Sequence, residues 1–88
     1  MSHFVYIIFS QNLNIYYKGY SSDPFKRVAD HNKNKSTYTK NKGPWILVYL
    51  ECFETKLEAL YREKQLKRQN HRYLEWLIKQ ETNLVNKL

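Results

Sequence analysis

Two short runs of β-branched and aromatic residues near the N-terminus constrain the fold more than any other feature of the chain. Residues 4–9 read F-V-Y-I-I-F, a composition that predicts a strand buried on both faces. Residues 15–20 have the same character and follow a polar stretch at residues 10–14, which favours a β-hairpin. The N-terminal part of the chain is therefore expected to form two antiparallel strands.

The spacing of this hairpin predicts which side chains face each other. If residues 11 and 12 form the reversal, Tyr6 lies opposite Tyr17, and Phe4 lies opposite Gly19. Two facing phenol hydroxyls could then serve one site. Most tyrosines in strands are ordinary packing residues, however, and a register slip of one residue would separate the pair.

A helix is predicted directly after the hairpin. Asp23 suits the N-cap, where a carboxylate accepts a free backbone N–H, and Pro24 suits the first helical position. Arg27 and His31 are four residues apart and therefore share one side of this helix. The other, apolar side is predicted to consist of Phe25, Val28, Ala29 and Asn32.

Arg27 and His31 each allow two interpretations. Arg27 is either an exposed cation or a guanidinium fork that grips a phosphate. His31 either interacts with the end of its helix or acts on a phosphate oxygen or a tyrosine hydroxyl. Because the two side chains lie one turn apart, a shared phosphate site is favoured.

The remainder of the chain predicts one more strand and further helices. Residues 32–43 are rich in Asn and Lys and predict a loop, whereas residues 45–53 form a nearly continuous apolar run that predicts the third strand. A capping box at residues 55–58 begins a helix that continues to about Gln69. Its apolar side is predicted to carry Ala59, Leu60 and Leu66.

Residues 70–71 are expected to interrupt the chain before a last helix, although one continuous long helix is an alternative. The apolar residues of this last segment are Tyr73, Leu74, Leu77, Ile78, Leu84 and Val85. The predicted fold class is α/β of the α+β type. A three-stranded, mainly antiparallel sheet is flanked by helices in the order β-β-α-β-α-α.

Glu63 falls near the centre of the apolar side of the penultimate helix. A carboxylate at such a position loses hydration unless a cation compensates. Mg²⁺ is one candidate, because it takes one or two carboxylates and fills its octahedron with water and phosphate. An ion pair with Lys67, four residues on, is the more ordinary explanation.

The charge of the chain predicts the class of its partner. Fifteen Lys and Arg residues against eight acidic ones leave a net charge of +7 on 88 residues. This balance favours a polyanion, with nucleic acid ahead of an anionic membrane, over a basic surface that has no partner. The predicted loop supplies the candidate phosphate contacts, which are Lys33, Lys35, Lys40 and Lys42.

Length and cysteine content restrict the class further. At 88 residues the chain is expected to form one domain. Cys52 is the single cysteine, which excludes an internal disulfide and fits a cytoplasmic location, and we expect it to be a small core residue. No apolar run is long enough to span a bilayer, and the N-terminus has no signal-peptide pattern, so no membrane association is expected.

The candidate residues, in their order and spacing, resemble the GIY-YIG nuclease superfamily, above all its small stand-alone bacterial members. The resemblance covers about residues 4–78, so residues 1–88 are expected to form a single domain of this type with its C-terminal helix running to the end. It rests on V-Y-I at 5–7, Y-K-G at 17–19, Arg27, His31, Asn32, Glu63, P-W-I-L-V-Y at 44–49 and A-L-Y-R-E-K-Q-L-K at 59–67.

The resemblance implies a role for each of five residues. Tyr6 and Tyr17 match the two tyrosines of the family, one of which activates or orients the attacking water, and which one does so stays open. Arg27 matches the arginine that grips the phosphate, and His31 matches the residue that assists it. Glu63 matches the carboxylate that holds one divalent ion, Mg²⁺ or Mn²⁺.

Two residues depart from the family pattern. Phe4 replaces the glycine of the first triad and is expected to narrow the approach to the site. Lys18 replaces the apolar residue of the second triad and should point away from Tyr17, because side chains alternate along a strand. We expect no added DNA-recognition domain, so the form of DNA stays open, with branched and single-stranded DNA among the candidates.

These features lead to two expected functions of different classes. The first is a metal-dependent DNA endonuclease, and the second is a nucleic-acid-binding module that keeps the nuclease fold without turnover. A protein-interaction adaptor is the least favoured interpretation, and no obligate protein partner is inferred.

Overall fold

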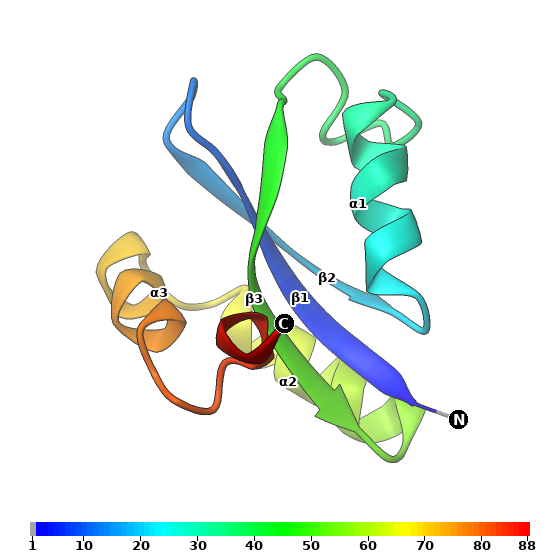
Figure 1. Cartoon of the computed structure of the whole chain (residues 1–88), viewed down its shortest axis with the longest axis vertical. Helices are drawn as coiled ribbons and strands as arrows, with labels where there is room; N and C mark the ends of the chain where they lie inside the picture. The colour runs from blue at the N-terminus through cyan, green and yellow to red at the C-terminus, as the bar shows by residue number, and fades with distance from the viewer. Residues whose placement is uncertain (1) are drawn as a thin grey trace.

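The computed structural model describes residues 2–88 and confirms the predicted order of elements (Figure 1). Strands β1 (His3–Ser10) and β2 (Ile15–Ser21) form the hairpin, and helix α1 (Pro24–Asn32) and strand β3 (Trp45–Phe53) follow. The chain ends with helices α2 (Lys56–Leu66) and α3 (His71–Ile78) and a 3₁₀ helix, η1 (Leu84–Lys87). None of the helices within residues 2–88 combines the length and hydropathy needed to cross a membrane.

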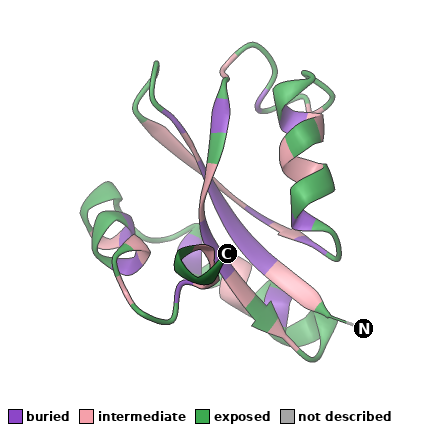
Figure 2. Ribbon diagram, in the orientation of Figure 1, coloured by how far each residue is buried: buried purple, intermediate pink, exposed green. Residues whose placement is uncertain are grey.

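Strand β1 is the centre of an antiparallel sheet with the order β2-β1-β3. Four successive residues of β1 are buried, as predicted for a strand covered on both faces (Figure 2). Val5 and Ile7 join one core cluster together with residues of α2 and α3. Tyr6 and Ile8 point to the other face and join a second cluster, which receives residues of α1 and η1.

The hairpin register differs from the predicted one by two residues. Tyr6 pairs with Gly19 rather than with Tyr17, and Phe4 is not opposite Gly19. The reason is a four-residue turn in place of the expected two, ending at Asn14 with a φ of 54°, a left-handed conformation that Asn tolerates. Because side chains alternate with a period of two, Tyr6 and Tyr17 nevertheless remain on the same face of the sheet.

Gly19 provides the space that the Tyr6 ring occupies. A Cβ at residue 19 would touch the Tyr6 hydroxyl and lie only 2.5 Å from Cζ and 2.9 Å from Cε1 of the same ring. Glycine is therefore required at this position for close approach between a side chain and the neighbouring strand.

Helix α1 begins as predicted but buries a different side. The Asp23 side chain accepts the backbone N–H of Lys26, which confirms the N-cap. Pro24 and His31 are the buried residues, whereas Phe25 is 55% exposed. Of the predicted apolar side, Val28 packs against the core, while Phe25, Ala29 and Asn32 are exposed. A histidine can occupy the buried side because both of its ring nitrogens have hydrogen-bond partners.

Helices α2 and α3 are separate, so the alternative of one long helix is wrong. Thr55 accepts the N–H of Glu58, which confirms the predicted helix start, although the Glu58 carboxylate accepts the Thr55 hydroxyl rather than its backbone N–H. Helix α2 ends at Leu66, slightly before the predicted end. Ala59 and Leu66 are buried as predicted, but Leu60 is exposed because α2 turns a narrower side toward the sheet than the pattern indicated.

Two predictions for the edges of the fold are also wrong. Cys52 is exposed rather than part of the core, because β3 is an edge strand and this part of it is only partly covered. Leu84 and Val85 lie in η1 rather than in α3, so the last α-helix does not run to the end of the chain. Asn83 makes the break, since its buried side chain accepts the Leu50 N–H at 3.1 Å and docks η1 against β3.

We expect Gly19→Ala to lower the free energy of unfolding by about 1–3 kcal/mol, the usual cost of forcing extra volume into a close-packed site. Urea unfolding measures the change, and Ser22→Ala, at an exposed position nearby, is the control, with an expected effect below about 0.5 kcal/mol. An unchanged unfolding midpoint for Gly19→Ala would show that the Tyr6 ring is not held against β2.

Candidate functional site

A chain of buried hydrogen bonds links the central strand to the loop after α1. The Tyr6 hydroxyl lies 2.9 Å from His31 Nε2, and His31 Nδ1 lies 2.6 Å from Thr39 Oγ1. All three side chains are buried, and within residues 2–88 no buried side-chain polar atom lacks a partner. Strand β1, helix α1 and the following loop therefore meet in one fully bonded polar cluster.

His31 is held as a neutral imidazole by its surroundings. Burial is the main cause that lowers the pKa of His31, and the Arg27 guanidinium lowers it further, while Asp30 opposes the change. A neutral imidazole has one donor and one acceptor nitrogen. When Tyr6 donates to Nε2, Nδ1–H therefore donates to Thr39, and in the other tautomer both bonds reverse.

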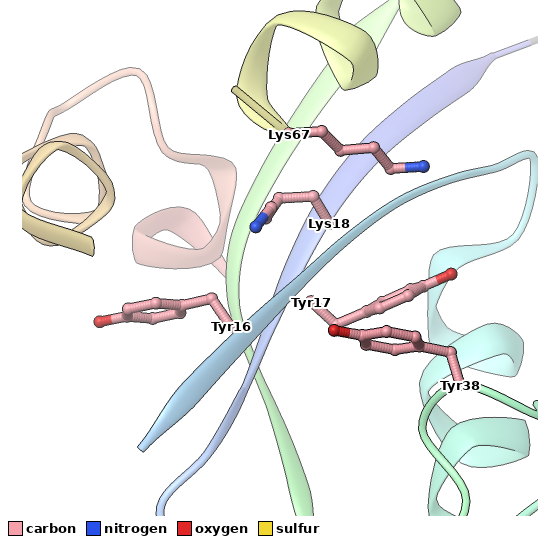
Figure 3. A pocket seen from close by; sticks show the side chains of 5 residues that line it. All are labelled: Tyr16, Tyr17, Lys18, Tyr38 and Lys67. Atoms are coloured by element: carbon pink, nitrogen blue, oxygen red, sulfur yellow. The ribbon is translucent and has the colours of Figure 1, made fainter. Parts of the chain in front are cut away.

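Tyr17 lies beside this cluster and is more open to solvent than Tyr6. Its ring centroid is 6.5 Å from that of Tyr6 and 5.0 Å from that of His31. Tyr6 is only 1% exposed, whereas Tyr17 lines a surface pocket that also includes Tyr38 (Figure 3). The two tyrosines are neighbours, as predicted, but only Tyr17 faces the pocket.

Charges from two helices act on the Tyr6 hydroxyl. Burial is the largest cause that raises the pKa of Tyr6 to about 12, and neighbouring Tyr17 adds to the increase. The positive charge of half-buried Arg27 opposes it, and the Glu63 carboxylate contributes a smaller increase. Tyr6 is therefore a protonated phenol at neutral pH, and both Arg27 and Glu63 lie near enough to influence it.

Glu63 comes to the site from the other side of the sheet. Helix α2 packs with the cluster that contains Val5 and Ile7, whereas α1 packs on the face that carries Tyr6. Glu63 therefore approaches the Tyr6 hydroxyl from a helix on the opposite face of the sheet from α1. Its side chain is 19% exposed and lies 3.7 Å from Lys67 Nζ, so the ion pair proposed as the ordinary explanation is present.

A metal ion at this site would depend on Glu63. Residues 2–88 contain no group of three or more His, Cys, Asp and Glu side chains placed to hold an ion. The single carboxylate fits Mg²⁺, which usually keeps several waters and binds through one or two carboxylates and substrate phosphates. Lys67 would have to give up its contact with Glu63 to make room.

The four loop lysines lie on the segment between α1 and β3. Lys33 and Lys40 are exposed, and Lys35 forms a largely exposed ion pair with Asp30. Lys42 Nζ lies 4.2 Å above the ring of Tyr38. Lys42 is thereby the loop lysine that is tied to the surface pocket.

The two residues that depart from the family pattern have different surroundings. Lys18 lies on the opposite side of β2 from Tyr17, as predicted, yet it lines the same pocket. Phe4 pairs with Ser21 and packs against the second core cluster. Because Phe4 is not across from Gly19, the register on which the predicted narrowing was based is not present.

Thr39 and Tyr38 belong to the site but were not predicted from the sequence. Nothing in the sequence marks Thr39 as a site residue. A threonine in a polar loop is ordinary, and its burial depends on where the loop folds back against α1. The sequence does mark Tyr38, because it is the single aromatic residue in the Asn/Lys-rich stretch 32–43. An aromatic side chain in a segment that has no helix or strand to support it points to a surface contact.

The lowered pKa of His31 predicts a loss of stability in acid. Below the unfolded-state pKa of about 6.5 the unfolded chain binds more protons than the folded chain. The stability due to neutral His31 is therefore complete above that pH and declines as the pH falls toward the folded-state pKa. His31→Gln should show a smaller decline in the urea midpoint between about pH 7.5 and about pH 5 than the parent protein. An equal decline in both proteins would assign the acid sensitivity to other groups.

Comparisons with known proteins identify a family and relatives for this chain. A family model described as the GIY-YIG catalytic domain matches residues 2–88. The UPF0213 protein SA0446 of Staphylococcus aureus (strain N315) is 46% identical over 67 residues, which cover 75% of this chain and 80% of that protein. The UPF0213 protein SAUSA300_0465 of strain USA300 matches to the same extent, 46% over 67 residues.

A solved structure extends the comparison to three dimensions. The solution NMR structure of the UPF0213 protein BH0048 from Bacillus halodurans is 32% identical and superposes with a TM-score of 0.59, covering 93% of this chain and 87% of that one. The roles of the individual site residues stay predictions. With a family match over nearly the whole chain, the fold and the predicted resemblance are confirmed, and this chain belongs to the GIY-YIG family, whose members are generally endonucleases.

Proposed function

We propose that this protein is an endonuclease that hydrolyses DNA phosphodiester bonds with one divalent ion, Mg²⁺ or Mn²⁺. One observation carries the proposal: Tyr6, Tyr17 and His31 meet next to Arg27 at the edge of a surface pocket that contains two lysines. Membership of the GIY-YIG family supports nuclease-type chemistry at this position. The net charge of +7 suits a polyanionic substrate.

Tyr17 is the tyrosine that we assign to the attacking water. It faces the pocket, whereas the Tyr6 hydroxyl is buried and engaged with His31. A free tyrosine has a pKa near 10 and is nearly all protonated at neutral pH, so it can accept a proton only after its own has left. We therefore assign Tyr17 to orienting the water and, in the phenolate form, to accepting its proton, as the new bond to phosphorus forms and the bond from phosphorus to the leaving sugar oxygen breaks, while Tyr6 and His31 hold its ring in place.

Arg27 and Glu63 act on the phosphate. The guanidinium of Arg27 binds two phosphate oxygens in a fork, a geometry that lysine cannot offer. Glu63 would hold the divalent ion, which supplies compensation for the negative charge that grows on the phosphate oxygens.

The loop lysines extend this binding to the flanking phosphates, and the residues that we assign to it are Lys33, Lys35, Lys40 and Lys42. Replacing any one of them with an uncharged residue should lower the slope of affinity against salt by about 1.

A non-catalytic DNA-binding module is the second candidate, and the Glu63–Lys67 ion pair favours it. Lys67 neutralises the carboxylate without any metal, at a distance of 3.7 Å. If that pair persisted with DNA bound, the protein would bind phosphates through its basic residues and leave the strand intact. Two results together would identify this case. Binding in a chelator would depend on salt, and single-stranded, duplex and branched DNA would all stay uncleaved when the divalent ion is supplied.

The endonuclease proposal predicts a clear difference between the two tyrosines. Tyr17→Phe should reduce the single-turnover rate of Mg²⁺-dependent DNA cleavage by about 10²-fold or more, the size of a lost acid–base group. Tyr6→Phe should cost less, because the ring remains in place and only its bond to His31 is removed. Tyr61→Phe, which makes the same chemical change at a side chain that is 69% exposed on α2, is the control and should cleave like the parent. Parent-like cleavage by Tyr17→Phe would exclude Tyr17 from the chemistry.

A further inference from the structure

The surface pocket next to Tyr17 has features that cleavage alone does not require. It measures about 380 Å³ and is lined by Tyr16, Tyr17, Lys18, Tyr38 and Lys67. Strand β2 is an edge strand, and the pocket extends over its free edge. Figure 3 shows Tyr17 and Tyr38 on one side of β2, Tyr16 and Lys18 on the other, and Lys67 reaching across from the end of α2.

Tyrosine rings line the pocket, and neighbouring aromatic side chains pack against them. The Tyr38 ring lies against Tyr17, with centroids 5.4 Å apart and planes tilted by 35°, and yet Tyr38 remains 59% exposed. Tyr16 is supported by Phe9, at 4.8 Å, and by His71, at 4.6 Å. An exposed ring with a fixed orientation offers a flat surface on which a nucleobase can stack, whatever its sequence.

The pocket also has an excess of positive charge. Within residues 2–88 Lys18 forms no ion pair, whereas Lys67 is paired with Glu63. Partial burial, and then repulsion by Lys67, lowers the pKa of Lys18. An anion between the two ammonium groups would relieve this repulsion, as phosphates do when they bind clustered cations.

We propose that this pocket is a subsite for one unpaired nucleotide adjacent to the bond that is cleaved. The base lies against Tyr38, and the phosphate of that nucleotide lies between Lys18 and Lys67. The proposal rests on the proposed function, because it takes the cleaved strand to run past Tyr17. A base within a duplex has its faces covered by neighbouring bases, so only an unpaired or extruded base can stack in this pocket.

Lys42 and Lys18 both fit this assignment. Lys42 covers part of the Tyr38 ring and can leave it for a phosphate when a base takes its place, because an exposed cation–π contact is weak. Lys18 stands where the family pattern has an apolar residue, so this cation in the pocket lining is a feature of this chain rather than of the shared pattern. A different role for Lys18 would be to prevent another strand from pairing with the free edge of β2.

The test compares DNA that has bases with DNA that lacks them. Fluorescence anisotropy in a chelator measures the affinity for a short oligothymidylate and for an abasic deoxyribose-phosphate chain of the same length. Tyr38→Ala should weaken oligothymidylate binding about tenfold, as expected for the loss of one stacked base, and leave abasic binding unchanged. Tyr38→Phe should bind both like the parent. Tyr61→Ala, which removes an exposed tyrosine outside the pocket, is the matched control and should also bind like the parent.

Lys18→Gln tests the phosphate half of the subsite. It should weaken the binding of both chains and lower the salt slope by about 1. The proposal is overturned if Tyr38→Ala changes the affinity for oligothymidylate and for the abasic chain equally, or changes neither affinity. It is also overturned if Lys18→Gln leaves both affinities unchanged and only causes self-association, which sedimentation would detect. Circular dichroism of each variant separates these outcomes from unfolding.

The binding and cleavage experiments together distinguish failure of the subsite proposal from failure of the nuclease proposal. If no DNA is cleaved but the Tyr38 effect depends on the base, the nuclease proposal fails, and the pocket stands as a nucleotide-binding site with no cleaved bond beside it. If Tyr17-dependent cleavage is found but Tyr38→Ala binds both chains like the parent, the subsite fails and the nuclease proposal stands.

Discussion

The contact between the Tyr6 ring and Gly19 is the constraint on which the rest of the site depends. It exists because the central strand places Tyr6 opposite the one residue of β2 that has no side chain. The ring can then reach past the strand so that its hydroxyl meets His31. A larger residue at position 19 would displace the ring and with it the hydrogen bond that fixes the buried side of α1.

The loop after α1 is fixed by bonds to the first residue of β3. The Asn32 side chain accepts the Trp45 backbone N–H at 2.6 Å and donates to the Trp45 carbonyl at 3.0 Å. The Trp45 indole N–H donates to the carbonyl of Thr39 at 3.3 Å. Thr39 is therefore held from both sides, by Trp45 through its backbone and by His31 through its hydroxyl. Tyr38, the neighbouring residue, is in this way presented to the pocket by a segment that contains no regular structure.

The elements of this fold could be predicted from the sequence because each is marked by local chemistry. The apolar runs indicated the strands, while Asp23 and the capping box at residues 55–58 marked the helix starts. The hairpin register could not be predicted, because it depends on the left-handed conformation of Asn14, which local composition does not reveal. The difference was two residues, so the two tyrosines kept their common face.

The site was predicted by residue type better than by position. A helical pattern that counts only apolar residues places the buried side of α1 wrongly, because His31 is buried through two hydrogen bonds rather than through hydrophobicity. The same limit concealed Thr39, which becomes important only as the partner of His31. Glu63 was named as a candidate metal ligand, which stays a prediction, and the sequence could not show that its helix lies on the opposite face from α1.

The ion pair between Glu63 and Lys67 connects the two proposals. While the pair is closed, Lys67 partly neutralises the carboxylate that would hold a metal ion, and Glu63 in turn weakens the attraction of Lys67 for a phosphate. Opening it would provide an anion for the metal and a cation for the nucleotide in the neighbouring pocket. Substrate and metal are then expected to assist each other's binding, since each removes one partner from the closed pair.

A crystal structure of the Tyr17→Phe protein with a short oligonucleotide and Mn²⁺, located by its anomalous scattering, tests the central claim most directly. We expect one ion bonded to Glu63 and to an oxygen of a phosphate that Arg27 also contacts, with Lys67 moved away from Glu63. An oligonucleotide bound with its phosphates away from Arg27, and Glu63 still paired with Lys67, would contradict the proposed nuclease site.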